Sequence, residues 1–111
     1  MIKRAFRNIK KSHDLKEEAS ALFKKGAVQA AIDKFQDCLE IDGLNIHYNA
    51  TIYLNIGIGL SKLKKHEDAL KALNRSVALN PNYAKAYVKR GEINTALEYH
   101  EEALRDFQQA H

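Results

Sequence analysis

An internal repeat with a spacing of about 34 residues constrains the fold of this 111-residue chain more than any other feature. When windows starting at Ser12, Ala50 and Ala84 are laid over one another, the same residue types recur at fixed places. Three places hold small residues, namely Ala19, Gly57 and Gly91; Ala31, Ala69 and Ala103; and Cys38, Ser76 and Ala110. One place holds bulky apolar residues, namely Phe35, Leu73 and Phe107. Small side chains let two helices approach closely and a bulky one fills the space beside them, so each window predicts a packed helix pair.

Turn residues divide each window into two helices. Gly26 follows "FKK" as a helix C-cap, and "DG" at residues 42–43 and "NPN" at residues 80–82 end the second helices of the first two windows. Because the first two windows start 38 residues apart and the last two start 34 apart, we expect a four-residue insertion near residues 44–47. The predicted helices cover residues 3–25, 28–41, 48–63, 67–79, 84–97 and 100–110.

Repeated helix pairs predict an all-α fold in which three antiparallel pairs stack as a right-handed α-solenoid. The first helix is expected to be extended, because "MIKRAFRNIKK" places Ile2, Phe6 and Ile9 on one helical stripe that continues through Leu15. The same stretch is basic and free of acids, so a mitochondrial transit peptide is the alternative, although serines and a cleavage-like break are missing. A start placed inside a longer protein is the third interpretation.

The distribution of charge and of apolar residues excludes two classes of partner. The chain has a net charge of +4, but five of its 18 basic residues lie before Asp14, which leaves 13 against 14 acids in the rest of the sequence. A body this close to neutral does not support a nucleic-acid surface. No apolar run approaches the ~20 residues that cross a bilayer, so we expect no membrane partner.

The content of cysteine, histidine and motifs favours a binding module over an enzyme. Cys38 is the only cysteine, which indicates a reducing compartment such as the cytoplasm. The five histidines are scattered singly, so no metal site is predicted. The sequence has no nucleophile elbow, metalloprotease motif, phosphate loop or dinucleotide turn, and "GIG" at residues 57–59 lies within a predicted helix. Neither catalysis nor a cofactor is expected.

The three windows resemble the tetratricopeptide repeat (TPR), whose period and small-residue places they share. The resemblance implies a basic N-terminal extension over residues 1–11 and a repeat domain over residues 12–111, with repeats at residues 12–49, 50–83 and 84–111. Gly43 stands where the family usually has proline, and the turns at Lys64 and Glu98 lack the usual glycine. These departures weaken local turns and leave the assignment intact.

The last predicted helix has no partner on its outer side. Repeat arrays bury their cores by stacking, so the final helix normally lies under a polar capping helix. Here Leu104 and Phe107 lie on the final helix and no capping helix follows. We therefore expect either a fragment of a longer protein or a domain whose last apolar stripe is covered by another partner, which includes a second copy of the chain.

The first helices of the three pairs are expected to line a concave groove, with inward residues that follow the helical period. These residues are Lys16, Ser20, Phe23 and Lys24 in the first pair, Leu54, Asn55, Ile58, Ser61 and Lys62 in the second, and Lys85, Val88, Lys89 and Glu92 in the third. Lys16 with Ser20, and Lys85 with Lys89, are each four residues apart and so share one helix face. Donors from three helices would converge on one volume, which predicts an anion site.

Three stretches resemble the TPR domains that clamp the C-terminal carboxylate of heat-shock 70 and 90 chaperones, namely "LKEEASALFKKG", "YLNIGIGLSKL" and "AKAYVKRG". The resemblance implies a ligand that ends in Glu-Glu-Val-Asp, with Lys16, Asn55, Lys85 and Lys89 at clamp positions and Ser20 where the family usually has asparagine. Phe23, Leu54 and Ile58 would then form apolar walls, with Lys62 and Glu92 also lining the groove. Glu92 lies one turn beyond Lys89 and is predicted to pair with it.

A narrower resemblance is to the second TPR block of co-chaperones that end in a J domain of the DnaJ type. It rests on the predicted insertion, the "RNIK" lead-in at residues 7–10 and "SKLKKHEDAL" at residues 61–70. The His-Pro-Asp signature of a J domain is not in this chain, so the resemblance implies only the binding role. The alternatives are a scaffold with a degenerate groove that binds another partner or itself, and a receptor for other C-terminal signals.

Overall fold

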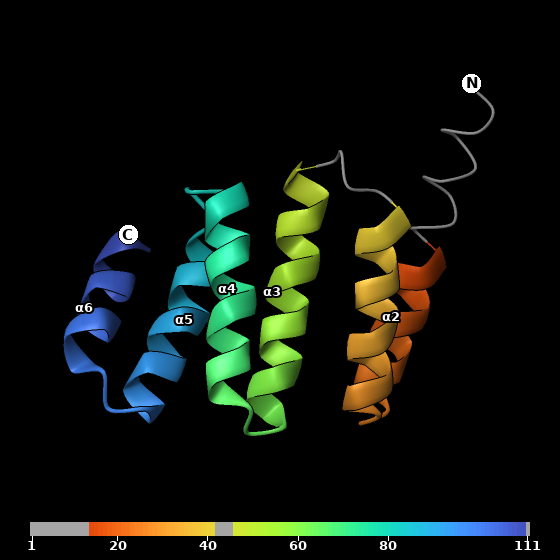
Figure 1. The fold of residues 1–111 in the computed structure, drawn as a ribbon, viewed down its shortest axis with the longest axis horizontal. Coiled ribbons are helices and arrows are strands. Elements are labelled where there is room, and N and C mark those ends of the chain that lie inside the picture. Colours follow the sequence, from red (N-terminus) through yellow and green to blue (C-terminus); the bar gives the residue numbers. More distant parts are fainter. Residues whose placement is uncertain (1–13, 42–45, 111) are drawn as a thin grey trace.

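The structure is a computed structural model that describes residues 14–41 and 46–110. These residues form only helices and turns, and the helices follow one another in a row from one end of the molecule to the other (Figure 1). The helices are residues 14–24, α2 (Val28–Ile41), α3 (Ile46–Lys62), α4 (His66–Leu79), α5 (Ala84–Ala96) and α6 (His100–Gln109). Neighbouring helices pack against each other from α2 through α6, and α3 also contacts α5. The predicted all-α repeat fold is therefore confirmed.

The helix boundaries agree with the predicted ones to within two residues wherever they are described. The largest difference is in α3, which begins at Ile46 where residue 48 was predicted, while α6 ends one residue before its predicted end. The predicted helical extension before residue 14 and the "DG" turn at residues 42–43 lie outside the described residues. The predicted insertion near residues 44–47 lies partly outside them.

The small and bulky places of the repeat meet across each helix pair. A Cβ atom added to Gly57 would lie 2.8 Å from Cγ of Leu73, and one added to Gly91 would lie 2.7 Å from Cε1 of Phe107. Neither distance leaves room for a methyl group. The pattern seen in the sequence is thus the packing of α3 on α4 and of α5 on α6, which sets the directions in which α3 and α5 present their side chains.

Three turns between paired helices share one backbone conformation. Gly26, Lys64 and Glu98 have φ angles of 87°, 64° and 65°, which lie in the left-handed region. After each of them, the next amide donates to the carbonyl five residues earlier, as in Ala27 to Leu22 at 2.9 Å, which closes a Schellman-type cap. Only the first turn has the glycine that this conformation favours, so the other two carry a small backbone strain.

A buried polar network joins α5 to α6 and α4. Asp106 is 4% exposed, and its Oδ1 accepts hydrogen bonds from Nε and Nη2 of Arg90 at 2.9 and 2.7 Å. Its Oδ2 accepts one from the amide of Asn94 at 2.8 Å, and Nη1 of Arg90 donates to Asn74 on α4 at 3.0 Å. Each oxygen of this carboxylate is thereby satisfied, and the network locks α5 in place between its neighbours.

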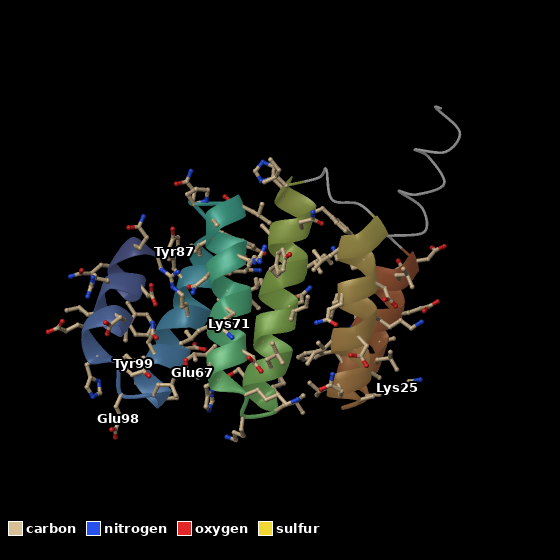
Figure 2. All side chains as sticks on the ribbon, viewed as in Figure 1. Lys25, Glu67, Lys71, Tyr87, Glu98 and Tyr99 are labelled. Carbon is tan, nitrogen blue, oxygen red and sulfur yellow. The ribbon has the colours of Figure 1, made fainter. Side chains whose placement is uncertain are left out.

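The turn before α6 also contacts α4. The hydroxyl of Tyr99 donates to Oε1 of Glu67 at 3.3 Å, and the two side chains lie close together near the lower ends of the helices in Figure 2. The negative charge of Glu67 raises the pKa of the Tyr99 hydroxyl. On α6 itself, Leu104 is 59% and Phe107 is 38% exposed. Within the described residues, no helix is long and apolar enough to span a membrane.

Candidate binding groove

Two adjoining pockets form a groove along the first helix of each pair. The larger, of about 570 Å³, lies between α3 and α5, and the smaller, of about 220 Å³, lies between residues 14–24 and α3. Asn55 and Ile58 of α3 line both pockets, so the two are halves of one groove. The larger half is lined by Thr51, Leu54, Tyr83, Ala84, Lys85, Val88 and Lys89, and the smaller half by Ser20, Phe23, Lys24 and Phe35.

Helical periodicity explains why these residues converge. Each lining helix contributes a set spaced by three and four residues, such as Lys85, Val88 and Lys89 on α5, and such residues lie on one face of a helix. On α3 the same spacing brings the amide of Asn55 to the border between the two halves. The side of α3 that carries Gly57 faces α4, because Gly57 packs on Leu73. The opposite side, which carries Asn55, is therefore left facing the groove.

The larger half combines ammonium groups with apolar walls. Lys85 is exposed in the first turn of α5, where the positive end of the helix dipole adds to its attraction for an anion. Among the described residues Lys85 has no ion-pair partner, whereas Nζ of Lys89 lies 3.4 Å from Oε2 of Glu92. The predicted pairing of Glu92 with Lys89 is therefore present. Leu54 is buried beneath them, and Val88 and Ile58 are half-buried.

The smaller half has apolar walls and a polar edge. Phe23, Phe35 and Ile58 form its walls, and Ser20 and Asn55 contribute the hydroxyl and the amide that border them. Nζ of Lys62 lies 5.4 Å from the centroid of the Phe23 ring, within the range of a cation–π contact. Lys62 therefore lies beside this half through its contact with Phe23, and Lys24 lines the half itself.

Lys16 is the predicted clamp residue that the structure places apart from the other four. It lines neither half of the groove, and its Nζ lies 5.5 Å from the centroid of the Tyr48 ring on α3. Cys38 lies fully buried near this pair, and burial raises the pKa of its thiol. Ser20, Asn55, Lys85 and Lys89, in contrast, all lie on the groove walls, while Glu92 reaches the groove through Lys89.

Four groove residues were missed by sequence reasoning, namely Phe35, Thr51, Tyr83 and Ala84. Thr51 and Tyr83 both line the larger half, and the Tyr83 hydroxyl donates to Oγ1 of Thr51 at 3.4 Å. Thr51 lies four residues before Asn55, so the helical period could have identified it. Tyr83 lies just before α5 begins, where no helical period applies.

The groove has the composition of a binding site for an anionic ligand with an apolar side chain. Ammonium and amide donors lie over an apolar floor, open to a ligand from solution. The part of the chain that the structure describes contains no cluster of three histidine, cysteine or acidic side chains able to hold a metal ion. The arrangement can therefore hold carboxylates by charge-assisted hydrogen bonds while burying an aliphatic group.

The fold and groove define a TPR domain, and the chain belongs to the tetratricopeptide repeat family. The family model described as tetratricopeptide repeat matches residues 50–83. A structure of the first TPR of Spaghetti (RPAP3) bound to the HSP90 peptide SRMEEVD has a TM-score of 0.83 and 35% identity, covering 91% of this chain and 77% of that chain. The second TPR domain of human RPAP3 in complex with the HSP70 peptide SGPTIEEVD has a TM-score of 0.83 and 27% identity, covering 93% and 82%.

A similar curated protein is DnaJ homolog subfamily C member 7 from Homo sapiens. It is 36% identical over 107 residues, which are 96% of this chain and 22% of that protein. The chain thus spans about a fifth of the length of this relative. The resemblance to TPR domains of J-domain co-chaperones is confirmed at the level of the shared domain.

Proposed function

We propose that this domain is a protein-interaction module of a co-chaperone that binds acidic C-terminal tails of the Glu-Glu-Val-Asp type. The partners are heat-shock 70 and 90 chaperones, the groove is the binding site, and no catalysis takes place in it. The observation that carries the proposal is the convergence of Ser20, Asn55, Lys85 and Lys89 from three helices on one groove. Similar TPR domains bind peptides that end in this sequence, which supports the same ligand class here.

The roles of the groove residues follow from their chemistry. Asn55 and Ser20 donate hydrogen bonds to the carboxylates of the tail's last residue, and Lys85 and Lys89 neutralise carboxylates in the larger half. Phe23, Leu54 and Ile58 supply apolar surface for a valine-like side chain. Lys16 would join the clamp by turning from Tyr48 toward the bound tail. The hydroxyl of Ser20 is shorter than an asparagine amide and reaches a carboxylate through water where the distance requires it.

The expected affinity is micromolar. Each charge-assisted hydrogen bond contributes about 1.5 to 3 kcal/mol, and the ordering of a flexible tail offsets much of the sum. A dissociation constant near micromolar corresponds to about −8 kcal/mol. Because the lysines are exposed or half-exposed, the affinity should fall as salt rises.

A paired titration tests the proposal. The peptide Met-Glu-Glu-Val-Asp with a free C-terminus is expected to bind, and the same peptide with a C-terminal amide is expected not to bind, because the amide removes the terminal charge. Isothermal titration calorimetry on the domain measures both. Equal isotherms for the two peptides would exclude the carboxylate clamp.

A second candidate function is a scaffold that associates through α6 and leaves the groove empty. The exposure of Leu104 and Phe107 favours it. Sedimentation at several protein concentrations, run beside the titration, distinguishes the two functions. Association of the domain without binding of the free-acid peptide would favour the scaffold.

The proposal extends to the whole protein only through its relatives. Relatives that contain such a domain include DnaJ homologues, so we place this domain in a J-domain co-chaperone of the cytoplasm. The single buried thiol of Cys38 fits a reducing compartment. Expression of the full-length protein with a fluorescent tag, followed by microscopy and a J-domain ATPase assay with a heat-shock 70 chaperone, tests both statements.

A further inference from the structure

The two lysines that α5 presents to the groove are not equivalent. Lys85 has no ion-pair partner among the described residues, whereas Lys89 lies 3.4 Å from Glu92 in the same helix. Both members of that pair are accessible, with side chains that are 43% and 54% exposed. A ligand carboxylate can therefore approach Lys85 directly, but at Lys89 it meets an acid that is already in place.

From this asymmetry we infer that Glu92 is an internal competitor for Lys89 and thereby limits the affinity of the groove for acidic tails. The inference rests on the proposed function. Because the pair is formed within one helix, Glu92 has a high effective concentration beside Lys89 in the free domain. A tail carboxylate that binds Lys89 must displace Glu92 or share the ammonium group with it. The displaced carboxylate then stays at the end of the groove and repels a ligand that carries several acids.

Other charged groups near this end do not cancel the effect. Arg90 follows Lys89 in sequence, but its guanidinium is held on the other side of α5 by Asp106. Lys24 lines the smaller half of the groove, and Lys62 lies beside that half with its ammonium over the ring of Phe23. Glu92 therefore acts mainly on Lys89 and on whatever the ligand places there.

The substitution Glu92→Gln tests the inference because it keeps the shape and the helix propensity of the side chain while removing its charge. We expect the affinity for Met-Glu-Glu-Val-Asp to rise about two- to fivefold, the range that corresponds to an exposed ion pair. The matched control is Glu18→Gln, which removes the same charge from a second exposed pair, Glu18 with Lys34 at 3.5 Å, outside both halves of the groove. The control should change the affinity by less than about 1.5-fold.

A double-mutant cycle separates competition for Lys89 from a general effect of net charge. In a Lys89→Gln background, Glu92→Gln should give a clearly smaller gain than in the wild type, because no ammonium remains to be released. An equal gain in both backgrounds, or an equal gain from Glu18→Gln, would overturn the inference.

The titrations also keep this inference distinct from the proposed function. If the wild-type domain binds the free-acid peptide and Glu92→Gln shows no gain, only the inference fails. If the wild type shows no binding and Glu92→Gln binds the free acid but not the amide, the inference stands and the proposed function of the natural domain fails. If neither protein distinguishes free acid from amide, both are wrong.

Discussion

Lys89 and Arg90 are neighbours in sequence, but α5 commits their two cations to different tasks. The side chain of Arg90 is 22% exposed, and its guanidinium makes hydrogen bonds to Asn74 and to Asp106, whose side chain is 5% exposed. The ammonium of Lys89 lies in the groove, where its ion-pair partner among the described residues is Glu92, in a longer and well-exposed pair. The comparison shows that a cation with buried, oriented acceptors serves the fold, while a cation with a weak exposed partner remains available to a ligand.

The largest effect on stability is expected from a substitution in the network around Arg90. Replacement of Asp106 by alanine leaves Nε and Nη2 of Arg90 and the amide of Asn94 without their acceptor, and should lower the free energy of unfolding by about 3 kcal/mol. Urea unfolding followed by circular dichroism measures it. Glu102→Ala on the same helix is the control, since its 3.9 Å pair with Arg105 is exposed and should contribute less than about 0.5 kcal/mol. A loss below about 1 kcal/mol for Asp106→Ala would show that Arg90 is ordinary surface.

The opposite result, a loss of binding without a loss of stability, is expected for a lysine of the groove. The substitution Lys85→Glu should weaken binding of the free-acid peptide at least about a hundredfold, or about 2.7 kcal/mol, because it replaces an attraction by a repulsion. Its free energy of unfolding should stay within about 0.5 kcal/mol of the wild type, since Lys85 is exposed and has no ion-pair partner among the described residues.

The control for this charge reversal is Lys71→Glu. Lys71 is exposed on α4, away from both halves of the groove (Figure 2), and the substitution changes the net charge by the same amount. We expect less than about a threefold change in affinity. If affinity survives Lys85→Glu, or falls equally in Lys71→Glu, the groove lysines are solvated surface.

The helices could be predicted from sequence because their packing depends on the sizes of the residues at fixed places of the repeat. Gly57 packs on Leu73 and Gly91 packs on Phe107, at distances too short for a Cβ atom at either glycine. The repeat of small and bulky residues therefore fixes the helix boundaries nearby. The start of α3 was predicted two residues late, because Ile46 is 52% exposed and no buried position fixes the register there.

The positions of groove residues could be predicted for short side chains and for side chains whose Cα atoms lie at the groove wall. The positions of the charged ends of long side chains could be predicted less well. Asn55 and Ser20 lie where the helical period puts them. Lys16 has four rotatable side-chain bonds, and its ammonium lies over Tyr48, a contact that no period encodes. The contact of Arg90 could not be predicted from the helical period, because its acceptor Asp106 is 16 residues away and on another helix.

A signal for the Arg90 network was nevertheless present in the repeat. At the places 34 residues before Arg90, Asn94 and Asp106, the chain has Ile56, Leu60 and Ala72. These three line a hollow between α2, α3 and α4, which shares no lining residue with the groove. Three apolar residues in one repeat are thus replaced together by three polar ones in the next, which indicates a linked network in place of a local packing contact.

That equivalence also tests the structural role of Arg90, with the smallest expected effect. The triple variant Arg90→Ile, Asn94→Leu and Asp106→Ala installs the apolar set of the preceding repeat. Since a buried ion pair contributes little more than well-packed apolar residues of similar volume, its free energy of unfolding should lie within about 1 kcal/mol of the wild type, although Asp106→Ala alone loses about 3 kcal/mol. Peptide affinity should be unchanged, because none of the three residues lines either half of the groove. Urea unfolding and the free-acid titration measure both quantities. A triple variant as unstable as Asp106→Ala would mean that the polar network contributes more than apolar packing at this junction, and a loss of peptide affinity would mean that the network positions α5 for the ligand.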